Sequence, residues 1–263
     1  MSDDGEPVSQ ARRPHGKPTE DRKLLRRAPY ADTSFQDNDA WRALRIMGEF
    51  VEGFDNLGDI SDGVSIFGSA RTAPTDPHYQ AAVETARILA EAGIPVITGG
   101  GPGIMEAANR GAFEAGGKSI GLNIKLPFEQ GLNAYTTKGL GFQFHYFFMR
   151  KLWFAYLAKA LVVFPGGFGT LDEMYEILTL AQTQKLSKKL AVVLYGPDYW
   201  NEVMDIGPMA KWGMIAPEDL KYLQPASTPE EAFTILRDFL IENHLVPATT
   251  QEQKTPGIAK TQS

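Results

Sequence analysis

The sequence predicts an α/β fold, a three-layer Rossmann-like parallel sheet with helices on both faces. Three observations lead to this prediction. Short apolar runs alternate with helical segments along most of the chain. The apolar runs are continuous, which is typical of strands buried on both faces of a parallel sheet. Several runs end in glycine-rich turns that open the next helix.

The elements follow one another in a regular order. A first helix is indicated by apolar residues at helical spacing from Trp41 to Phe54, with Asp37 or Asp39 as its N-cap. Strands are expected over residues 64–67, 95–98, 118–122, 139–144, 160–164, 190–195 and about 221–224. Further helices are expected over residues 78–92, 103–115, 145–158, 170–183 and 228–243.

The ends of the chain differ in composition from its centre. Residues 1–35 are polar and rich in charge, so they are expected to form a flexible N-terminal arm. Residues 36–246 form the expected Rossmann-like domain, and residues 247–263 are expected to be a disordered C-terminal tail. Because the arm has almost nothing to bury, its removal is expected to leave fold and activity largely intact.

Composition excludes several classes of protein. The 263 residues include 32 acidic and 26 basic side chains, a net charge of −6 that disfavours a nucleic-acid partner. The absence of cysteine excludes disulfides, zinc–thiolate sites and a cysteine nucleophile. No apolar run approaches the ~20 residues that span a bilayer, and no signal peptide is recognisable. We therefore expect a cytoplasmic protein with no membrane partner.

Three expected strands end in loops of small residues. Because ligands of parallel sheets bind at the carboxyl ends of the strands, these loops are candidate binding elements. Glycine lets backbone N–H groups approach a ligand, and a helix N-terminus favours an anion. Two such loops lead into helices expected to open at Ile104 and Leu171. The alternative is that the glycines merely form strand–helix turns. The candidate phosphate-binding residues are Gly68, Ser69, Gly99, Gly100, Gly101, Gly103, Gly166, Gly167, Gly169 and Thr170.

Other familiar motifs are absent or misplaced. Residues 112–119 match a loose P-loop pattern, but a helix precedes them and a strand follows, the reverse of a working P-loop. The dinucleotide pattern G-x-G-x-x-G fails in the loop at 99–103, so NAD chemistry has no support. The four histidines lack metal-ligand spacing, and no G-x-S-x-G nucleophile elbow occurs. We expect no metal.

The candidate catalytic groups are a glutamate and an arginine. Glu173 lies on the helix that follows the loop at 165–170, and Arg150 lies on an aromatic-rich helix after another strand. Asp172 is better explained as a charge that complements the helix dipole, and Glu176 lies three residues beyond Glu173. An ordinary alternative for Arg150 is a surface charge or an ion-pair partner.

Two motifs carry a family resemblance. Gly99-Gly-Gly-Pro-Gly-Ile-Met105-Glu-Ala and Pro165-Gly-Gly-Phe-Gly-Thr-Leu-Asp-Glu173 resemble the signature motifs of the LOG (Lonely Guy) family, long mislabelled as lysine decarboxylases. The second motif matches P-G-G-x-G-T-x-x-E at every fixed position, whereas the first has glycine at 103 rather than 104. The resemblance spans about residues 60–245 and includes the run from Gly121 to Gln130.

The resemblance implies an activity. Members of the family hydrolyse the N-glycosidic bond of nucleoside 5′-monophosphates, such as AMP or a cytokinin riboside 5′-monophosphate, to a free base and ribose 5-phosphate. It implies that Glu173 and Arg150 are the catalytic pair, that Met105 belongs to the nucleotide site, and that no cofactor is needed. It also implies a homo-oligomer, at least a dimer.

Two other functions stay open at this point. One is a non-catalytic carrier of a nucleotide or of the molybdenum cofactor, a pterin, on the same fold. The other is the older decarboxylase label, which would require a pyridoxal phosphate Schiff-base lysine. Nothing around the lysines of this sequence marks such a residue.

Overall fold

The computed structural model describes residues 19–25, 39–58, 60, 63–126, 131–186 and 188–244. The expected tail and most of the expected arm lie outside these residues, as do both expected domain boundaries and Asp37.

A single sheet of seven parallel strands forms the centre of the described domain. The strand order is β4-β3-β2-β1-β5-β6-β7, and every neighbouring pair is parallel. The chain moves outward from β1 to β4 and then returns to place β5 on the other side of β1. This reversal creates a switch point between β1 and β5, where parallel sheets bind their ligands. The strands are β1 Gly63–Phe67, β2 Val96–Thr98, β3 Ser119–Ile124, β4 Gly141–Phe144, β5 Ala158–Val163, β6 Ala191–Tyr195 and β7 Leu223–Ala226.

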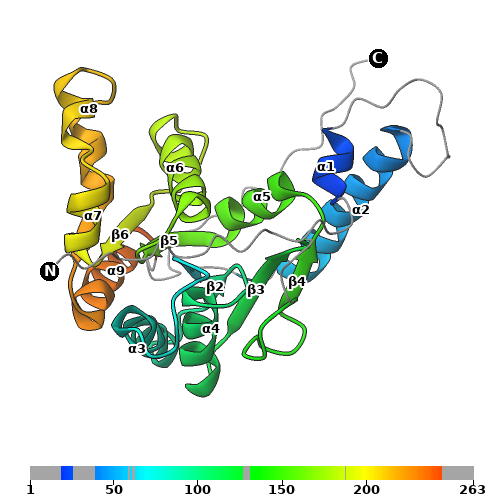
Figure 1. Ribbon diagram of the computed structural model, residues 1–263, viewed down its shortest axis with the longest axis horizontal. Helices are drawn as coiled ribbons and strands as arrows, with labels where there is room; N and C mark the ends of the chain where they lie inside the picture. The colour runs from blue at the N-terminus through cyan, green and yellow to red at the C-terminus, as the bar shows by residue number, and fades with distance from the viewer. Residues whose placement is uncertain are drawn as a thin grey trace, which may run out of the picture.

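Helices cover both faces of the sheet (Figure 1), so the predicted three-layer α/β fold is confirmed. Helices α3, α4 and α9 pack on one face, and α2, α5, α6 and α7 pack on the other. None of the helices in the described ranges is long and apolar enough to cross a membrane. The helices are α1 Glu20–Leu24, α2 Asp39–Leu57, α3 Pro77–Glu91, α4 Ile104–Glu114, α5 Phe147–Leu157, α6 Phe168–Gln182, α7 Pro197–Val203, α8 Gly207–Lys211 and α9 Pro229–Asn243, with a 3₁₀ helix at Pro217–Tyr222.

The continuous apolar runs are explained by two cores, one on each face of the sheet. Along β5, Ala160 and Val162 belong to the core under α3, α4 and α9. Leu161 and Val163 belong to the core under α5 and α6. Successive side chains of a strand point to opposite faces, so a strand covered on both faces needs apolar residues at every position.

Three parts of the described chain differ from the sequence expectation. Helix α6 begins at Phe168 rather than Leu171, so Gly169 and Thr170 lie in its first turn. The last strand lies at Leu223–Ala226, and its Pro225 is tolerated because β7 is at the edge of the sheet. Helices α7 and α8 were not predicted; they have seven and five residues, and each has a proline at one of its first two positions, where proline is tolerated.

Part of the segment expected to be a flexible arm, residues 1–35, forms a helix that contacts the domain. Residues Glu20–Leu24 form helix α1, whose first turn is capped by Thr19. Glu20 pairs with Arg45 of α2 at 2.6 Å, and Leu24 packs against the core under α5 and α6. The composition of the arm is polar, but a few of its side chains find partners on the domain.

Candidate active site

The three glycine-containing loops meet at the carboxyl edge of the sheet. Ser69, in the loop after β1, connects the other two. Its N–H donates to the carbonyl of Pro165 at 3.0 Å, and its carbonyl accepts from the N–H of Ile104 at 3.1 Å. The structure therefore brings together the strand ends of β1, β2 and β5 around the switch point. Gly68 permits this approach, since a Cβ there would overlap Ile104.

The loop at 99–103 is held by polar side chains that are buried or partly buried. Thr98 accepts from the N–H of Gly100 at 2.9 Å. Asn123 donates to the carbonyl of Gly99 at 3.2 Å, and Asn133 donates to the carbonyl of Gly101 at 3.1 Å. The two asparagines bind carbonyl oxygens and so fix the loop without using its N–H donors, whereas Thr98 occupies the N–H of Gly100.

Backbone conformation and side-chain packing explain why this loop contains glycines. Gly100 and Gly103 have φ values of 65° and 69°, which side-chain-bearing residues rarely adopt. The Met105 side chain fills the space beside Gly99 and Gly101, since a Cβ on either would overlap it. Met105 thus supports the loop by packing.

The loop at 165–170 is the clearest candidate for a cradle that binds an anion. Gly167 is the N-cap of α6 and makes no side-chain cap bond. Within the described residues, the N–H groups of Gly167, Phe168 and Gly169 have no acceptor, and all three residues are exposed. Unpaired N–H groups at a helix N-terminus attract phosphate. The loop is held at Gly166, whose carbonyl accepts from the Tyr199 hydroxyl at 2.7 Å.

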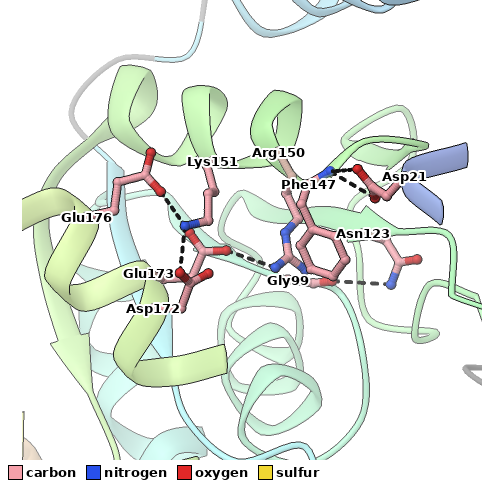
Figure 2. Close-up of polar contacts among 9 residues, drawn as sticks. All are labelled: Asp21, Gly99, Asn123, Phe147, Arg150, Lys151, Asp172, Glu173 and Glu176. Atoms are coloured by element: carbon pink, nitrogen blue, oxygen red, sulfur yellow. Dashed lines mark hydrogen bonds and ion pairs between the residues drawn. The ribbon is translucent and has the colours of Figure 1, made fainter. Parts of the chain in front are cut away.

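Beside the cradle, Arg150 and Glu173 form a buried ion pair (Figure 2). Arg150 lies in the first turn of α5 and Glu173 in the second turn of α6. The Arg150 Nη2 donates to Glu173 Oε1 at 2.8 Å, and only 13% and 4% of the two side chains are exposed. The Arg150 guanidinium also lies over the rings of Phe147 and Phe154, at 5.1 and 5.9 Å from their centroids.

Part of the hydrogen-bonding capacity of Arg150 is unused. Its Nε is buried and finds no partner among the described residues. A buried donor without a partner is costly, and it is available to an oxygen of a bound ligand.

Opposing effects act on the charge of Glu173. Burial raises the pKa of Glu173, whereas the positive charges of Arg150 and Lys151 lower it, and burial prevails. A carboxylate with a raised pKa beside a cation is typical of functional sites.

The neighbouring carboxylates have different partners (Figure 2). Lys151 lies 2.8 Å from Asp172 and 2.6 Å from Glu176. Burial disfavours the Lys151 ammonium, but the two carboxylates outweigh burial and raise its pKa. Asp172 is half exposed and forms an ordinary ion pair, unlike Glu173.

Sequence reasoning missed four residues that shape the site. The carbonyl oxygens of the glycine loops accept hydrogen bonds from Asn123, Asn133 and Tyr199. Asp21 contacts α5 from outside the domain core. The available signal for Asn123 was a polar residue directly after the strand expected over residues 118–122; in the structure it lies within β3. Nothing in the local sequence points to the other three.

Known proteins resemble this chain in sequence and in fold. A family model described as "Possible lysine decarboxylase" matches residues 105–236. The cytokinin riboside 5′-monophosphate phosphoribohydrolase LOG of Oryza sativa subsp. japonica is 29% identical over 170 residues, which are 63% of this chain and 68% of that protein. The corresponding enzyme LOG1 of Arabidopsis thaliana is 26% identical over 190 residues, 70% of this chain and 87% of that protein.

A solved structure shares the fold. The Moco carrier protein from Chlamydomonas reinhardtii is similar with a TM-score of 0.50 and 24% identity, over 69% of this chain and 99% of that one.

Proposed function

The chain belongs to the family described as "Possible lysine decarboxylase", the family of the LOG phosphoribohydrolases, and from that premise we propose that it is an N-glycosidase. Its substrates are nucleoside 5′-monophosphates, AMP or a cytokinin riboside 5′-monophosphate, and its products are the free base and ribose 5-phosphate. The observation that carries the proposal is the buried Arg150–Glu173 pair beside an open cradle of backbone N–H groups.

The proposed chemistry uses the charge of Glu173. As the base departs, positive charge develops on the ribose and the transition state resembles an oxocarbenium ion. The Glu173 carboxylate stabilises this charge and takes a proton from the attacking water. The water oxygen bonds to C1′ as the glycosidic bond breaks, the departing base takes a proton from solvent, and Glu173 returns the proton it took from the water to solvent. Arg150 opposes the rise in the pKa of Glu173 that burial causes, and its unpaired Nε can bind a ribose hydroxyl.

The proposed role of the cradle is to anchor the 5′-phosphate. The N–H groups of Gly167, Phe168 and Gly169 lie at the N-terminus of α6, whose second turn carries Glu173. A phosphate held there places the ribose near the carboxylate, so binding energy from a remote group serves to orient the reacting atoms.

The test is a comparison of AMP with adenosine, which lacks only the phosphate. Released adenine is measured by chromatography, with a panel of other nucleoside monophosphates to find the preferred base. We expect AMP to be cleaved with a kcat/KM at least about 100-fold above that of adenosine, and inorganic phosphate to compete. Equal rates on AMP and adenosine would contradict the phosphate anchor.

The same assay separates the enzyme from the carrier alternative. A carrier of a nucleotide or pterin on this fold binds AMP without releasing adenine. Calorimetric binding of AMP with no adenine formed over hours would therefore support the carrier and contradict the enzyme.

We also propose that the protein is a homo-oligomer, at least a dimer. Helix α2 contacts α5 and presents an exposed apolar stripe at helical spacing. Sedimentation at several protein concentrations tests this, and a monomer at all of them would contradict it. The stripe consists of Leu44, Met47, Val51 and Phe54.

A further inference from the structure

Helix α1 reaches the candidate active site through Asp21. Both carboxylate oxygens of Asp21 lie 3.3 Å from the N–H of Phe147, the first residue of α5 (Figure 2). The Glu20–Arg45 ion pair and the packing of Leu24 hold α1 in this place. A segment far from the site in sequence thus contacts the helix that carries Arg150.

Asp21 supplies a cap that α5 lacks. The N-cap residue of α5 is Tyr146, which makes no side-chain cap bond. The N–H groups of a first helical turn need outside acceptors, and a carboxylate there also complements the helix dipole. Asp21 provides both the acceptor and the charge.

A second carboxylate holds the backbone just before α5. Glu49 of α2 is buried and accepts from the His145 N–H at 3.2 Å, and its carboxylate lies 2.7 Å from His145 Nδ1. The backbone on both sides of Tyr146 is therefore fixed by acidic residues from α1 and α2.

The contact continues from Asp21 to the reacting groups. The Phe147 N–H donates to the Asp21 carboxylate, and the Phe147 ring lies against the guanidinium of Arg150. Arg150 in turn donates to Glu173. Burial raises the pKa of Asp21, while the Phe147 N–H and the nearby Arg150 charge lower it. The order of contacts is Asp21, Phe147, Arg150 and Glu173.

We propose that Asp21 is a positioning residue of the active site, which fixes the first turn of α5 and so the direction from which Arg150 reaches Glu173. This inference rests on the proposed function. The competing explanation is that α1 only adds stability to the domain.

A set of Asp21 variants in the full chain separates the two explanations. Asp21→Ala removes the acceptor and the charge, Asp21→Asn keeps an acceptor, and Asp21→Glu keeps the charge. Arg22→Ala is the matched control, because Arg22 is its neighbour on α1 and is exposed. For each protein, kcat and KM for AMP are measured as a function of pH, together with Tm.

A positioning role predicts a specific pattern. Asp21→Ala lowers kcat by about 10- to 100-fold and changes KM for AMP by less than about threefold, since the phosphate cradle is untouched. Asp21→Glu recovers most of the rate, and Arg22→Ala behaves as wild type. If Asp21→Ala lowers Tm but leaves kcat unchanged, the role is structural and the proposal is wrong.

The pH profile adds a readout that stability does not move. The charged groups facing Glu173 are Arg150 and Lys151 from α5 and Asp172 from its own helix. A displaced Arg150 no longer lowers the pKa of Glu173, so the acid limb moves to higher pH in Asp21→Ala. Loss of a distant negative charge alone would move the limb to lower pH, and that result contradicts positioning.

Failure of the proposed function is distinguishable from failure of this inference. If wild type releases no base from any nucleotide, the proposed function fails. The inference is then decided by measuring the pKa of the Glu173 carboxyl by NMR in the absence of substrate. A higher pKa in Asp21→Ala than in wild type supports positioning, and equal values overturn it.

Discussion

Replacing Glu173 with glutamine tests the candidate catalytic carboxylate directly. Glutamine has the same length, and its side-chain oxygen can still accept from Arg150 Nη2, which lies 2.8 Å from Glu173 Oε1. The substitution therefore removes a negative charge from a side chain that is 4% exposed while changing its shape very little.

The expected magnitude follows from that burial. A charge that acts on the transition state in a water-excluded site contributes ~3–4 kcal/mol, so kcat should fall by about two to three orders of magnitude. AMP affinity should change by less than about tenfold, because the phosphate is proposed to bind at the N-terminus of α6. Stability should fall by about 1–3 kcal/mol, since Arg150 keeps its hydrogen bond but loses its counter-charge.

The assay combines adenine release with AMP binding by calorimetry, and Asp172→Asn is the matched control. Asp172 is the preceding residue, is half exposed and pairs with Lys151, which retains Glu176 when Asp172 is neutralised. Exposed pairs contribute only ~0–1 kcal/mol, so this control should keep wild-type turnover. If Glu173→Gln turns over at the wild-type rate, or if both variants lose the same activity, Glu173 is not the catalytic group.

Three further predictions concern pH, the cradle and the N-terminus. Burial raises the pKa of Glu173 above its usual 4.5, so its protonated form persists to higher pH. We therefore expect kcat to decline on acidification with an apparent pKa above 4.5. An acid limb of the pH profile at or below that value would contradict this prediction. Gly166→Ala should lower Tm, because its Cβ would overlap Thr170. Gly169→Ala should not lower Tm, because its Cβ would meet open space. Equal Tm values for the two variants in calorimetry would show that the loop shifts without cost to accept a Cβ at Gly166. Deleting residues 1–30 should lower kcat, because the deletion removes Asp21; this is the opposite of the expectation from composition. A truncated protein with wild-type kcat would instead support the expectation from composition.

Most of the fold could be predicted because its signals are local. Continuous apolar runs identify strands buried on both faces, and each expected strand before residue 200 overlaps an observed one. Helices α7 and α8 could not be predicted in this way. Both are short and have a proline at one of their first two positions, and α7 is held by the packing of Trp200 in the core.

The candidate site was predictable where one side chain or one loop carries its chemistry. Glycine loops after buried strands indicate a cradle, and a switch point explains why loops from β1, β2 and β5 meet. The ion pair of Arg150 with Glu173 is different. No spacing rule relates two helices joined through a strand, so the sequence suggested this pair only through the family resemblance.

Asp21 shows where reasoning from local composition fails in principle. A polar segment is expected to stay unfolded because it cannot bury enough apolar surface to offset its lost entropy. That balance assumes that the segment has only itself to pack against. Asp21 instead uses the unpaired N–H of a helix that begins 126 positions later, an interaction whose value depends on a site that the domain has already built. A short helix with a carboxylate in its first turn therefore needs little apolar area of its own when the domain offers it a helix N-terminus, and the Phe147 that it contacts lies against Arg150 of the proposed catalytic pair.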